Sequence, residues 1–218
     1  MIGTEDSDDG PVKHLLYVAD PMCSWCYGFA PVIAGLADHF GDRLPVQLMM
    51  GGLRAGHTKV WSPADRETTA GYWKKVEAAS GQPFDYEAFK AREGWIYDTE
   101  PACRAVVTMR MLNPPVALAF KERVQHAFYA EGRDTTDDAV LADVAAECGV
   151  DREMYFAELQ SEEARKETQR DFAAAKQAGI HGFPTLLAGD GTGHYLVVTN
   201  GYRPLDGMAE ALERWLEA

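Results

Sequence analysis

The chain has 218 residues, 46% of them hydrophobic and 25% charged, with a formal net charge of −13 at pH 7. This balance is that of one globular domain, or of a domain with a large insertion, and it excludes a disordered chain. The strong negative charge disfavours binding to nucleic acid and to anionic membranes. No apolar run approaches the ~20 residues that a membrane-spanning helix needs.

Residues 1–12 are mostly acidic and polar, and we expect them to form a flexible tail. They contain no basic segment followed by an apolar run and a small-residue cleavage site, so they do not read as a signal peptide. We therefore expect a cytoplasmic protein. In that compartment most thiols are kept reduced, and a closely spaced cysteine pair is more often catalytic or metal-binding than structural.

Two cysteines separated by two residues, Cys23 and Cys26, follow the short apolar run 15–19. This run contains β-branched and aromatic residues and ends at an Asp-Pro pair, which is typical of a buried strand. Beyond the cysteines, apolar residues recur at helical spacing as far as Gly41, namely Phe29, Val32, Ile33, Leu36 and Phe40. Cys23 is thus expected at a helix N-terminus, where free N–H groups favour a thiolate. A thiolate attacks disulfides and a second thiol one turn later resolves the mixed disulfide, so the pattern predicts a thiol–disulfide redox site.

Two other interpretations of the pair are a structural disulfide and half of a zinc site. A structural zinc ion usually needs four ligands, but the other cysteines, Cys103 and Cys148, stand alone and no two histidines have zinc-finger spacing. We therefore expect no metal site. A chain of this length buries a core without a disulfide staple. We expect Cys103 and Cys148 to be buried, unreactive thiols rather than a second redox pair.

The rest of the chain predicts one further strand, a long helical region and then a hairpin. Residues 44–50 form the second strand of a right-handed β-α-β unit. From about Trp61 to Ala178 strand signals disappear. Ser62 followed by a proline is typical of a helix start. Further helices are predicted at 100–112, where Asn113 and two prolines end the helix, at 116–128, after the caps at 134–138, and within 151–179.

The last part of the chain returns to strands. Residues 183–187 and 195–199, joined by a glycine-rich turn, predict an antiparallel hairpin. A final helix is expected to open at Pro204, with these residues inward: Leu205, Met208, Leu212, Trp215 and Leu216.

These elements predict an α/β fold, β-α-β followed by β-β-α in one mixed sheet, with a large all-helical insertion. We divide the chain into a tail (1–12), a first half of the core (13–60), a helical insertion (61–178) and a second half of the core (179–218).

Three segments, 20–28, 100–106 and 182–185, give the chain a resemblance to the thioredoxin superfamily over nearly its whole length. It resembles the DsbA-like branch in particular, and within it the FrnE-related protein-disulfide isomerases. The resemblance implies a thioredoxin-like fold in which Cys23 is the nucleophile and Cys26 the resolving thiol. It also implies that Pro184 is cis and lies beside the redox pair, so that the Phe183 backbone could pair with an extended peptide. Trp25 and Phe183 either form an apolar lip for unfolded substrates or merely pack.

One departure from that family concerns the residues between the cysteines. Strongly oxidising periplasmic members carry a histidine there, whereas this chain has Ser24 and Trp25, neither of which brings a cation. We therefore expect a less oxidising couple, nearer to about −270 mV than to about −120 mV. Reduction, isomerisation or a detoxifying role fits that potential.

The sequence thus predicts a protein-disulfide oxidoreductase or isomerase that acts on protein disulfides or on small-thiol disulfides. No cofactor is expected beyond the dithiol, although glutathione could be a co-substrate, and thioredoxin or glutathione could be the redox partner. One alternative is a kappa-type glutathione transferase or isomerase, which usually has serine at the position of Cys23. Another is a non-catalytic, chaperone-like protein that binds clients. Four polar loop residues could border the site, and we assign them no role: Arg54, His57, His181 and Arg203.

Overall fold

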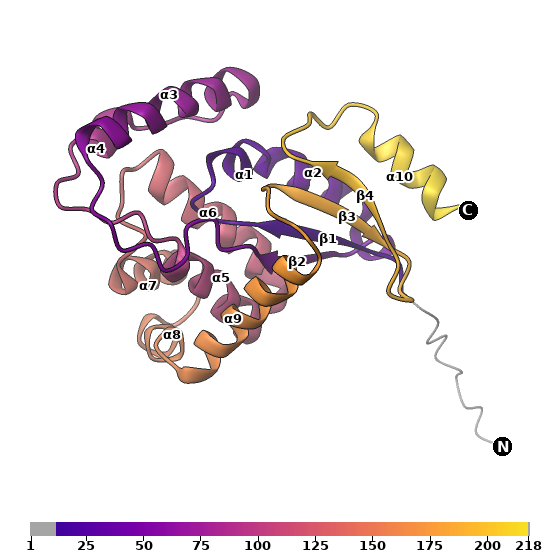
Figure 1. Ribbon diagram of the computed structural model, residues 1–218. Coiled ribbons are helices and arrows are strands. Elements are labelled where there is room, and N and C mark those ends of the chain that lie inside the picture. Colours follow the sequence, from indigo (N-terminus) through magenta and orange to yellow (C-terminus); the bar gives the residue numbers. More distant parts are fainter. Residues whose placement is uncertain (1–11, 218) are drawn as a thin grey trace.

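The computed structural model describes residues 12–217 as a mixed four-stranded sheet surrounded by helices (Figure 1). The strands are β1 (His14–Ala19), β2 (Val46–Met50), β3 (Thr185–Gly189) and β4 (Tyr195–Asn200). Their order in the sheet is β2-β1-β3-β4. β1 and β2 are parallel, whereas β1 pairs with β3, and β3 with β4, in antiparallel register. The predicted thioredoxin-like α/β fold with a mixed sheet is confirmed.

The strand directions bring four distant segments to one edge of the sheet. The register places Val18 beside both Met49 and Thr185, and Thr185 beside Asn200. The carboxyl ends of β1, β2 and β4 and the amino end of β3 therefore meet at this edge. The segments that follow β1, β2 and β4 begin at residues 20, 51 and 201, and the segment that leads into β3 ends at residue 184.

The helix after β1 is broken into α1 (Ser24–Gly28) and α2 (Ala30–Phe40), and η1 (Gly41–Arg43) follows. The predicted apolar positions are all buried, but the periodic pattern does not reveal the break at Phe29. Pro31 has no N–H group, so the carbonyl of Tyr27 loses its helical donor. The Gln82 side chain donates to that carbonyl instead, at 3.4 Å.

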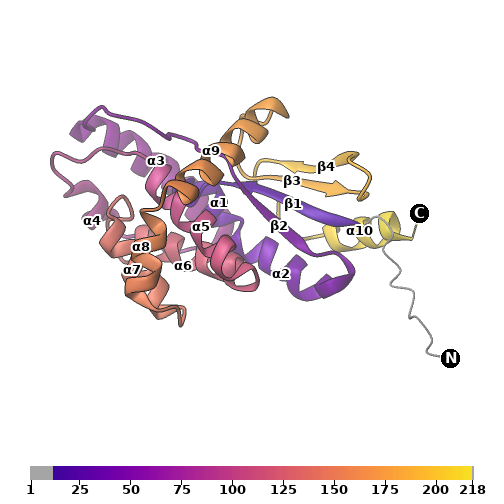
Figure 2. The ribbon, with the colours of Figure 1, turned by 90° about the horizontal axis from the view of Figure 1, so that it is seen from below.

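The region from Trp61 to Ala178 is helical, as predicted. Figure 2 shows α3, α4, α7 and α8 gathered beyond one end of the sheet. Ser62 caps the first of these helices through a reciprocal capping box with Asp65. A short helix at Tyr86–Lys90 was not predicted. The elements of this region are α3 (Pro63–Ser80), α4 (Tyr86–Lys90), α5 (Glu100–Leu112), η2 (Pro114–Val116), α6 (Ala117–Tyr129), α7 (Asp138–Glu147), α8 (Arg152–Leu159) and α9 (Glu162–Gln177).

The helical region and the sheet share one hydrophobic core. At the helical end this core is a cluster of aromatic rings, in which Trp73 and Phe89 have centroids 4.0 Å apart. At the edge strand β2, Asp171 of α9 accepts a hydrogen bond from the Met50 N–H at 2.8 Å and pairs with Arg110 of α5. The insertion is therefore anchored to the sheet both by burial and by a shared carboxylate.

The final helix, α10 (Met208–Leu216), begins four residues later than predicted. Gly207 before it has φ = 72°, a left-handed conformation that a helix interior does not accept. Met208 and Leu212 are buried as expected, but Leu205 lies in the preceding turn and is 37% exposed, so its predicted inward position was wrong. Glu213 of α10 pairs with His39 and Arg43 at the end of α2 and in η1.

The predicted acidic tail, residues 1–12, lies outside the described residues except for Val12, which is exposed. Within residues 12–217, no helix has the length and apolar character needed to cross a membrane.

Candidate active site

Cys23 and Cys26 lie at the edge of the sheet where the strand ends converge. Cys23 is the N-cap residue of α1, with an extended backbone conformation, and Cys26 lies in the first turn of that helix. The two sulfurs differ in access, because Cys23 is 6% exposed and Cys26 is 0% exposed. Burial raises the pKa of the Cys26 thiol, and its proximity to Cys23 raises that pKa further. The pair is therefore asymmetric, because both cysteines are buried but only Cys23 keeps a small exposed fraction.

A buried carboxylate holds the turn that carries the pair. Asp20 accepts hydrogen bonds from the N–H of Met22 at 2.8 Å and of Leu53 at 2.7 Å, and Cys103 donates its S–H to the same carboxyl group at 3.4 Å. Burial raises the pKa of Asp20, although these hydrogen bonds partly offset the effect. Asp20 thereby ties the turn after β1 to the loop after β2 and to helix α5.

The Phe183–Pro184 peptide bond is cis, and this loop lies directly beside the pair. The Sγ atom of Cys23 donates to the Phe183 carbonyl oxygen at 3.5 Å. The Phe183 ring covers Gly51, where any Cβ atom would overlap the ring. Phe183, Gly51 and Phe172 help to line a cavity of about 470 Å³, to which His181 also contributes. The structure thus brings Cys23, Phe183 and Pro184 together.

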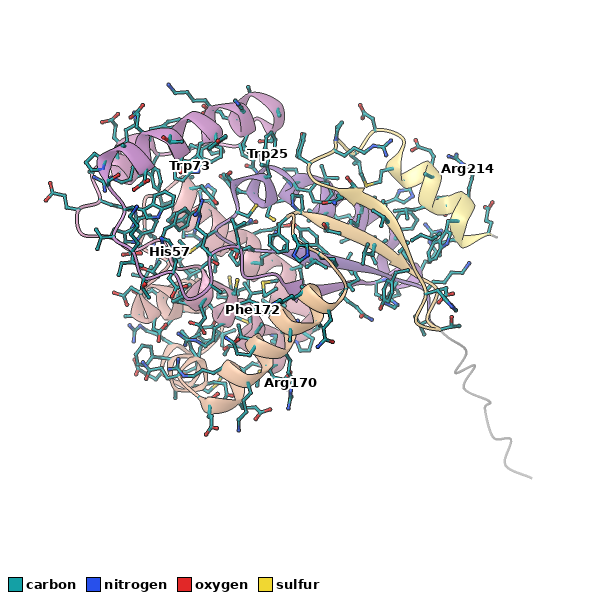
Figure 3. All side chains as sticks on the ribbon, viewed as in Figure 1. Trp25, His57, Trp73, Arg170, Phe172 and Arg214 are labelled. Carbon is teal, nitrogen blue, oxygen red and sulfur yellow. The ribbon has the colours of Figure 1, made fainter. Side chains whose placement is uncertain are left out.

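Trp25 is half-buried on α1, and its ring packs against Tyr202, with centroids 5.4 Å apart. Figure 3 shows it beside α1, whereas Phe172 lies on α9. Trp25 thus belongs to α1, whereas Phe183 belongs to the loop before β3. Arg203, next to Tyr202, is exposed.

The sequence analysis assigned no role at the site to three buried side chains near the pair: Lys121, Tyr17 and Tyr97. Lys121 of α6 is fully buried, and its Nζ atom donates to the Tyr17 hydroxyl of β1 at 3.3 Å. Tyr97 donates its hydroxyl hydrogen to the carbonyl of Met22, immediately before Cys23. A single lysine in an amphipathic helix is normally expected to face solvent. The one sequence signal that Lys121 is buried is its spacing, because the polar residues Gln125 and Tyr129 follow it at four and eight positions on the same helix face.

A basic cluster lies in the loop after β2. Arg54, His57 and Lys59 help to line a cavity of about 250 Å³ that reaches Trp61 and α3. The Arg54 guanidinium lies 4.9 Å from the centre of the Trp61 ring and 5.4 Å from that of Tyr97. In a chain with a net charge of −13, three basic side chains within six residues form a local exception.

The remaining cysteines stand apart from each other. Cys103 is buried as predicted, and burial raises its pKa. Cys148, which was also expected to be buried, is half-buried because it caps the C-terminal end of α7 at the surface. Within the part of the chain that the structure describes, no three His, Cys, Asp or Glu side chains gather as a metal site would require.

Comparison with known proteins places this geometry in a family. The DSBA-like thioredoxin domain matches residues 15–213. The chain belongs to this DsbA-like family. Its members share the fold of thiol–disulfide oxidoreductases, which agrees with the resemblance seen in the sequence.

Solved structures of similar chains are available. A candidate protein disulfide isomerase from Nitrosomonas europaea is 38% identical, with a TM-score of 0.87 over 94% of this chain and 98% of that one. The cytosolic disulfide reductase DsbM from Pseudomonas aeruginosa is 27% identical, with a TM-score of 0.78 over 94% and 98% of the two chains. DsbM has also been solved with glutathione. A curated relative, the ClpXP adapter protein SpxH of Halalkalibacterium halodurans, is 21% identical over 97% of this chain and 72% of its own length.

The first prediction concerns Asp20. Replacing it in Asp20→Ala leaves the buried N–H group of Met22 and the partly buried N–H group of Leu53 without their acceptor, so we expect the free energy of unfolding to fall by about 2–4 kcal/mol. Urea denaturation measures the change. The matched control is Asp190→Ala, because Asp190 accepts similar turn hydrogen bonds at an exposed position. Equal losses in the two variants would show that Asp20 does not hold the turn.

The second prediction concerns Gly51. In Gly51→Ala the new Cβ atom displaces the Phe183 ring, so we expect the KM for a peptide disulfide to rise about three- to tenfold. Overpacking should cost about 1–2 kcal/mol of unfolding free energy. Steady-state kinetics and urea denaturation test both effects.

The control is Gly71→Ala in α3, where a Cβ atom meets nothing within 4 Å. This change should stabilise the helix by about 0.5–1 kcal/mol and leave the KM unchanged. Phe183→Ala should raise the KM as Gly51→Ala does, and the double variant should show no further increase. An unchanged KM in Gly51→Ala would exclude the Phe183 ring from substrate binding.

Proposed function

We propose that the protein catalyses thiol–disulfide exchange, with Cys23 as the attacking thiolate and Cys26 as the resolving thiol. The observation that carries this proposal is the unequal access of the two sulfurs beside the cis-Pro184 loop. Of the two, only Cys23 keeps an exposed fraction, 6%, whereas Cys26 is fully buried. A substrate disulfide can therefore meet Cys23 alone, and Cys26 can react only after a mixed disulfide has formed next to it.

The reaction has two steps. The Cys23 thiolate attacks one sulfur of the substrate disulfide, which releases the other sulfur as a thiolate. The Cys26 thiolate then attacks Cys23, which releases the rest of the substrate and leaves the Cys23–Cys26 disulfide. Run in reverse from this disulfide, the same steps oxidise a dithiol, and returning the mixed disulfide to a different substrate sulfur is isomerisation.

The Phe183 loop and the Trp25 side chain of α1 are both placed to contact a substrate that lies along this edge of the sheet. The Phe183 ring borders the cavity of about 470 Å³, and its carbonyl is already used by Cys23. An extended peptide would reach Cys23 between these two aromatic side chains. The apolar surfaces of both rings suit an unfolded protein substrate.

Glutathione or a glutathione-mixed disulfide is the small-thiol substrate that we propose. Glutathione carries two carboxylates, and Arg54, His57 and Lys59 offer them cationic or hydrogen-bonding partners. Arg54 packs on Tyr97, which in turn bonds to the residue before Cys23, so the basic cluster is two contacts away from the nucleophile. The structure of DsbM with glutathione adds support from a relative.

Two alternative functions predict different results for cysteine variants. A kappa-type glutathione transferase or isomerase would retain glutathione-dependent activity in Cys23→Ser, whereas thiol–disulfide exchange would be lost. A client-binding protein, such as the adapter that SpxH is described to be, would bind its partner equally well without either cysteine. The absence of a histidine between the cysteines fits a reductase or isomerase better than a strong oxidant.

The third prediction is a redox equilibrium. In a glutathione redox series the wild-type protein should form one reversible Cys23–Cys26 disulfide, with a potential nearer to about −270 mV than to about −120 mV. The reason is that neither Ser24 nor Trp25 provides a cation that would stabilise the reduced, thiolate form. Thiol alkylation followed by mass spectrometry measures the oxidised fraction.

In this titration Cys23→Ser and Cys26→Ser should each abolish the transition. The matched control is Cys103→Ser, which removes a buried cysteine of another element and should leave the transition in place. A protein that forms no reversible disulfide at all would overturn the proposed function.

The fourth prediction concerns Arg54. In Arg54→Gln the KM for glutathione disulfide should rise about tenfold, because one charge-assisted hydrogen bond to a carboxylate is lost. The kcat should change little, since Arg54 does not contact the reacting sulfurs. Reduction of hydroxyethyl disulfide, which is uncharged, should be unaffected.

The control is Arg152→Gln, which removes an exposed arginine of α8 that pairs with Asp143 and Glu153. It removes one positive charge, as Arg54→Gln does, so it separates local recognition of glutathione from long-range electrostatic attraction. If the two variants raise the KM equally, the basic cluster does not bind glutathione.

A further inference from the structure

The cavity of about 470 Å³ lies one residue away from Cys23. The Cys23 Sγ atom contacts the Phe183 carbonyl oxygen at 3.5 Å, and Phe183 helps to line the cavity. The rest of the lining comes from the loop after β2, from α9 and from the segment before β3. Proteins bind ligands in cavities of this size, about 300–1,000 Å³. A disulfide that reacts with Cys23 therefore brings its neighbouring groups close to a cavity that the exchange itself does not use.

Two consecutive glycines shape the apolar wall of this cavity. A Cβ atom at Gly51 would overlap the Phe183 ring, and one at Gly52 would lie only 2.8 Å from the Phe172 ring. Gly52 also has φ = 66°, a left-handed backbone conformation that residues with a Cβ atom rarely adopt. The two aromatic rings can therefore lie directly against the backbone of the loop. The other apolar residues of the lining are Leu53, Ala55 and Ile180.

The polar side chains of the lining are both basic. They are Lys176, in the last turn of α9, and His181, before β3, and both are exposed. No Asp or Glu is among the described residues that line the cavity. Within residues 12–217 neither basic side chain forms a salt bridge, whereas Lys166 of the same helix pairs with Glu162. In a chain with a net charge of −13, this cavity thus combines an apolar wall with an exposed basic rim that carries no partner.

We propose that this cavity selects peptide disulfides in which an apolar side chain lies next to the half-cystine and a carboxylate side chain lies one residue further away. This inference rests on the proposed function, because it names the protein substrates of the same site. The apolar side chain contacts the rings of Phe172 and Phe183, and the carboxylate pairs with Lys176 and His181 at the rim. Burial of the apolar side chain contributes affinity. The charge complementarity discriminates between substrates.

This cavity is separate from the basic cluster assigned to glutathione. Leu53 and Ala55 line the cavity beside Phe183, whereas Arg54, between them, lines the cavity of about 250 Å³. The described linings of the two cavities share no residue, so the loop after β2 has one cavity on each side. Glutathione brings carboxylates but no apolar side chain, which suits the basic cluster and not the cavity beside Phe183. The two cavities therefore recognise different disulfides, one of a small thiol and one of a peptide.

The fifth prediction measures this selection in the first step of the reaction. Blocked pentapeptides carry a central cysteine as its 2-pyridyl disulfide, and attack of the Cys23 thiolate on the peptide sulfur releases 2-thiopyridone, which is followed by absorbance. Phenylalanine and then glutamate stand on the amino or on the carboxyl side of the cysteine. Matched peptides replace phenylalanine by alanine, or glutamate by lysine. The rate that other thiols give in Cys23→Ser is subtracted.

On one of the two sides, reduced wild-type protein should react about tenfold faster with the phenylalanine–glutamate peptide than with either matched peptide. The preference for glutamate over lysine should also weaken at high salt, because the basic rim is exposed.

Two variants separate the apolar wall from the basic rim. Lys176→Gln should reduce the preference for glutamate over lysine to about threefold and keep the preference for phenylalanine over alanine. Phe172→Ala should do the reverse, because it removes part of the wall and leaves both basic groups. Ala55→Phe fills the cavity from the loop and carries this second test if Phe172→Ala does not fold. Each preference is a ratio of rates within one variant, so a change in the reactivity of Cys23 itself cancels.

The matched control is Lys166→Gln, which removes the same charge from α9 outside this cavity and should change neither preference. A loss of the glutamate preference in Lys166→Gln or in Arg54→Gln as large as in Lys176→Gln would overturn the inference, because overall charge or the basic cluster would then recognise the carboxylate. Equal rates for all peptides in the wild type would overturn it while leaving the proposed function intact. If no peptide released 2-thiopyridone through Cys23, the proposed function and this inference would fail together.

Discussion

The Asp20 carboxylate is the contact on which the site depends. It accepts hydrogen bonds from Met22 and Leu53 and one from the thiol of Cys103, and so joins the turn after β1, the loop after β2 and helix α5. Without an acceptor there, the buried N–H group of Met22 and the partly buried N–H group of Leu53 would be unsatisfied next to Cys23. The same anchoring sets Gly51 in place, and because Gly51 has no side chain the Phe183 ring can lie over it. One buried carboxylate thus positions both Cys23 and the wall of the adjacent cavity.

The two cysteines differ in burial. Cys23, at the N-cap of α1, keeps 6% of its surface exposed, whereas Cys26 is fully buried, where a thiolate is hard to form. The core also holds polar groups, because the buried Lys121 of α6 donates to the Tyr17 hydroxyl of β1 at 3.3 Å.

Local pattern and spacing predicted most of the fold, and long-range contacts account for what they missed. Runs of apolar residues identified all four strands, and caps such as Ser62 identified the helix starts. The break at Phe29 depends on a proline two residues later and on a carbonyl that Gln82 satisfies, which no periodicity records. Gly207 delays α10 by its left-handed conformation. At the site, the motif identified Cys23, Cys26 and Pro184, but Asp20, Gly51 and Lys121 act only through partners brought close by folding.

The helical insertion therefore contributes to the site itself and does not merely cover the sheet. Tyr97, Cys103 and Lys121 all belong to this region, and each contacts the turn, its anchoring carboxylate or the strand beneath the cysteines. Their side chains come from three separate segments that share one core with the sheet. Because that core is continuous, the position of α6 fixes the distance between Lys121 and Tyr17, and the position of α5 fixes Asp20. The contacts that hold the turn are accordingly supplied by the insertion, whereas the turn itself, with Cys23 and Cys26, belongs to the β-α-β unit.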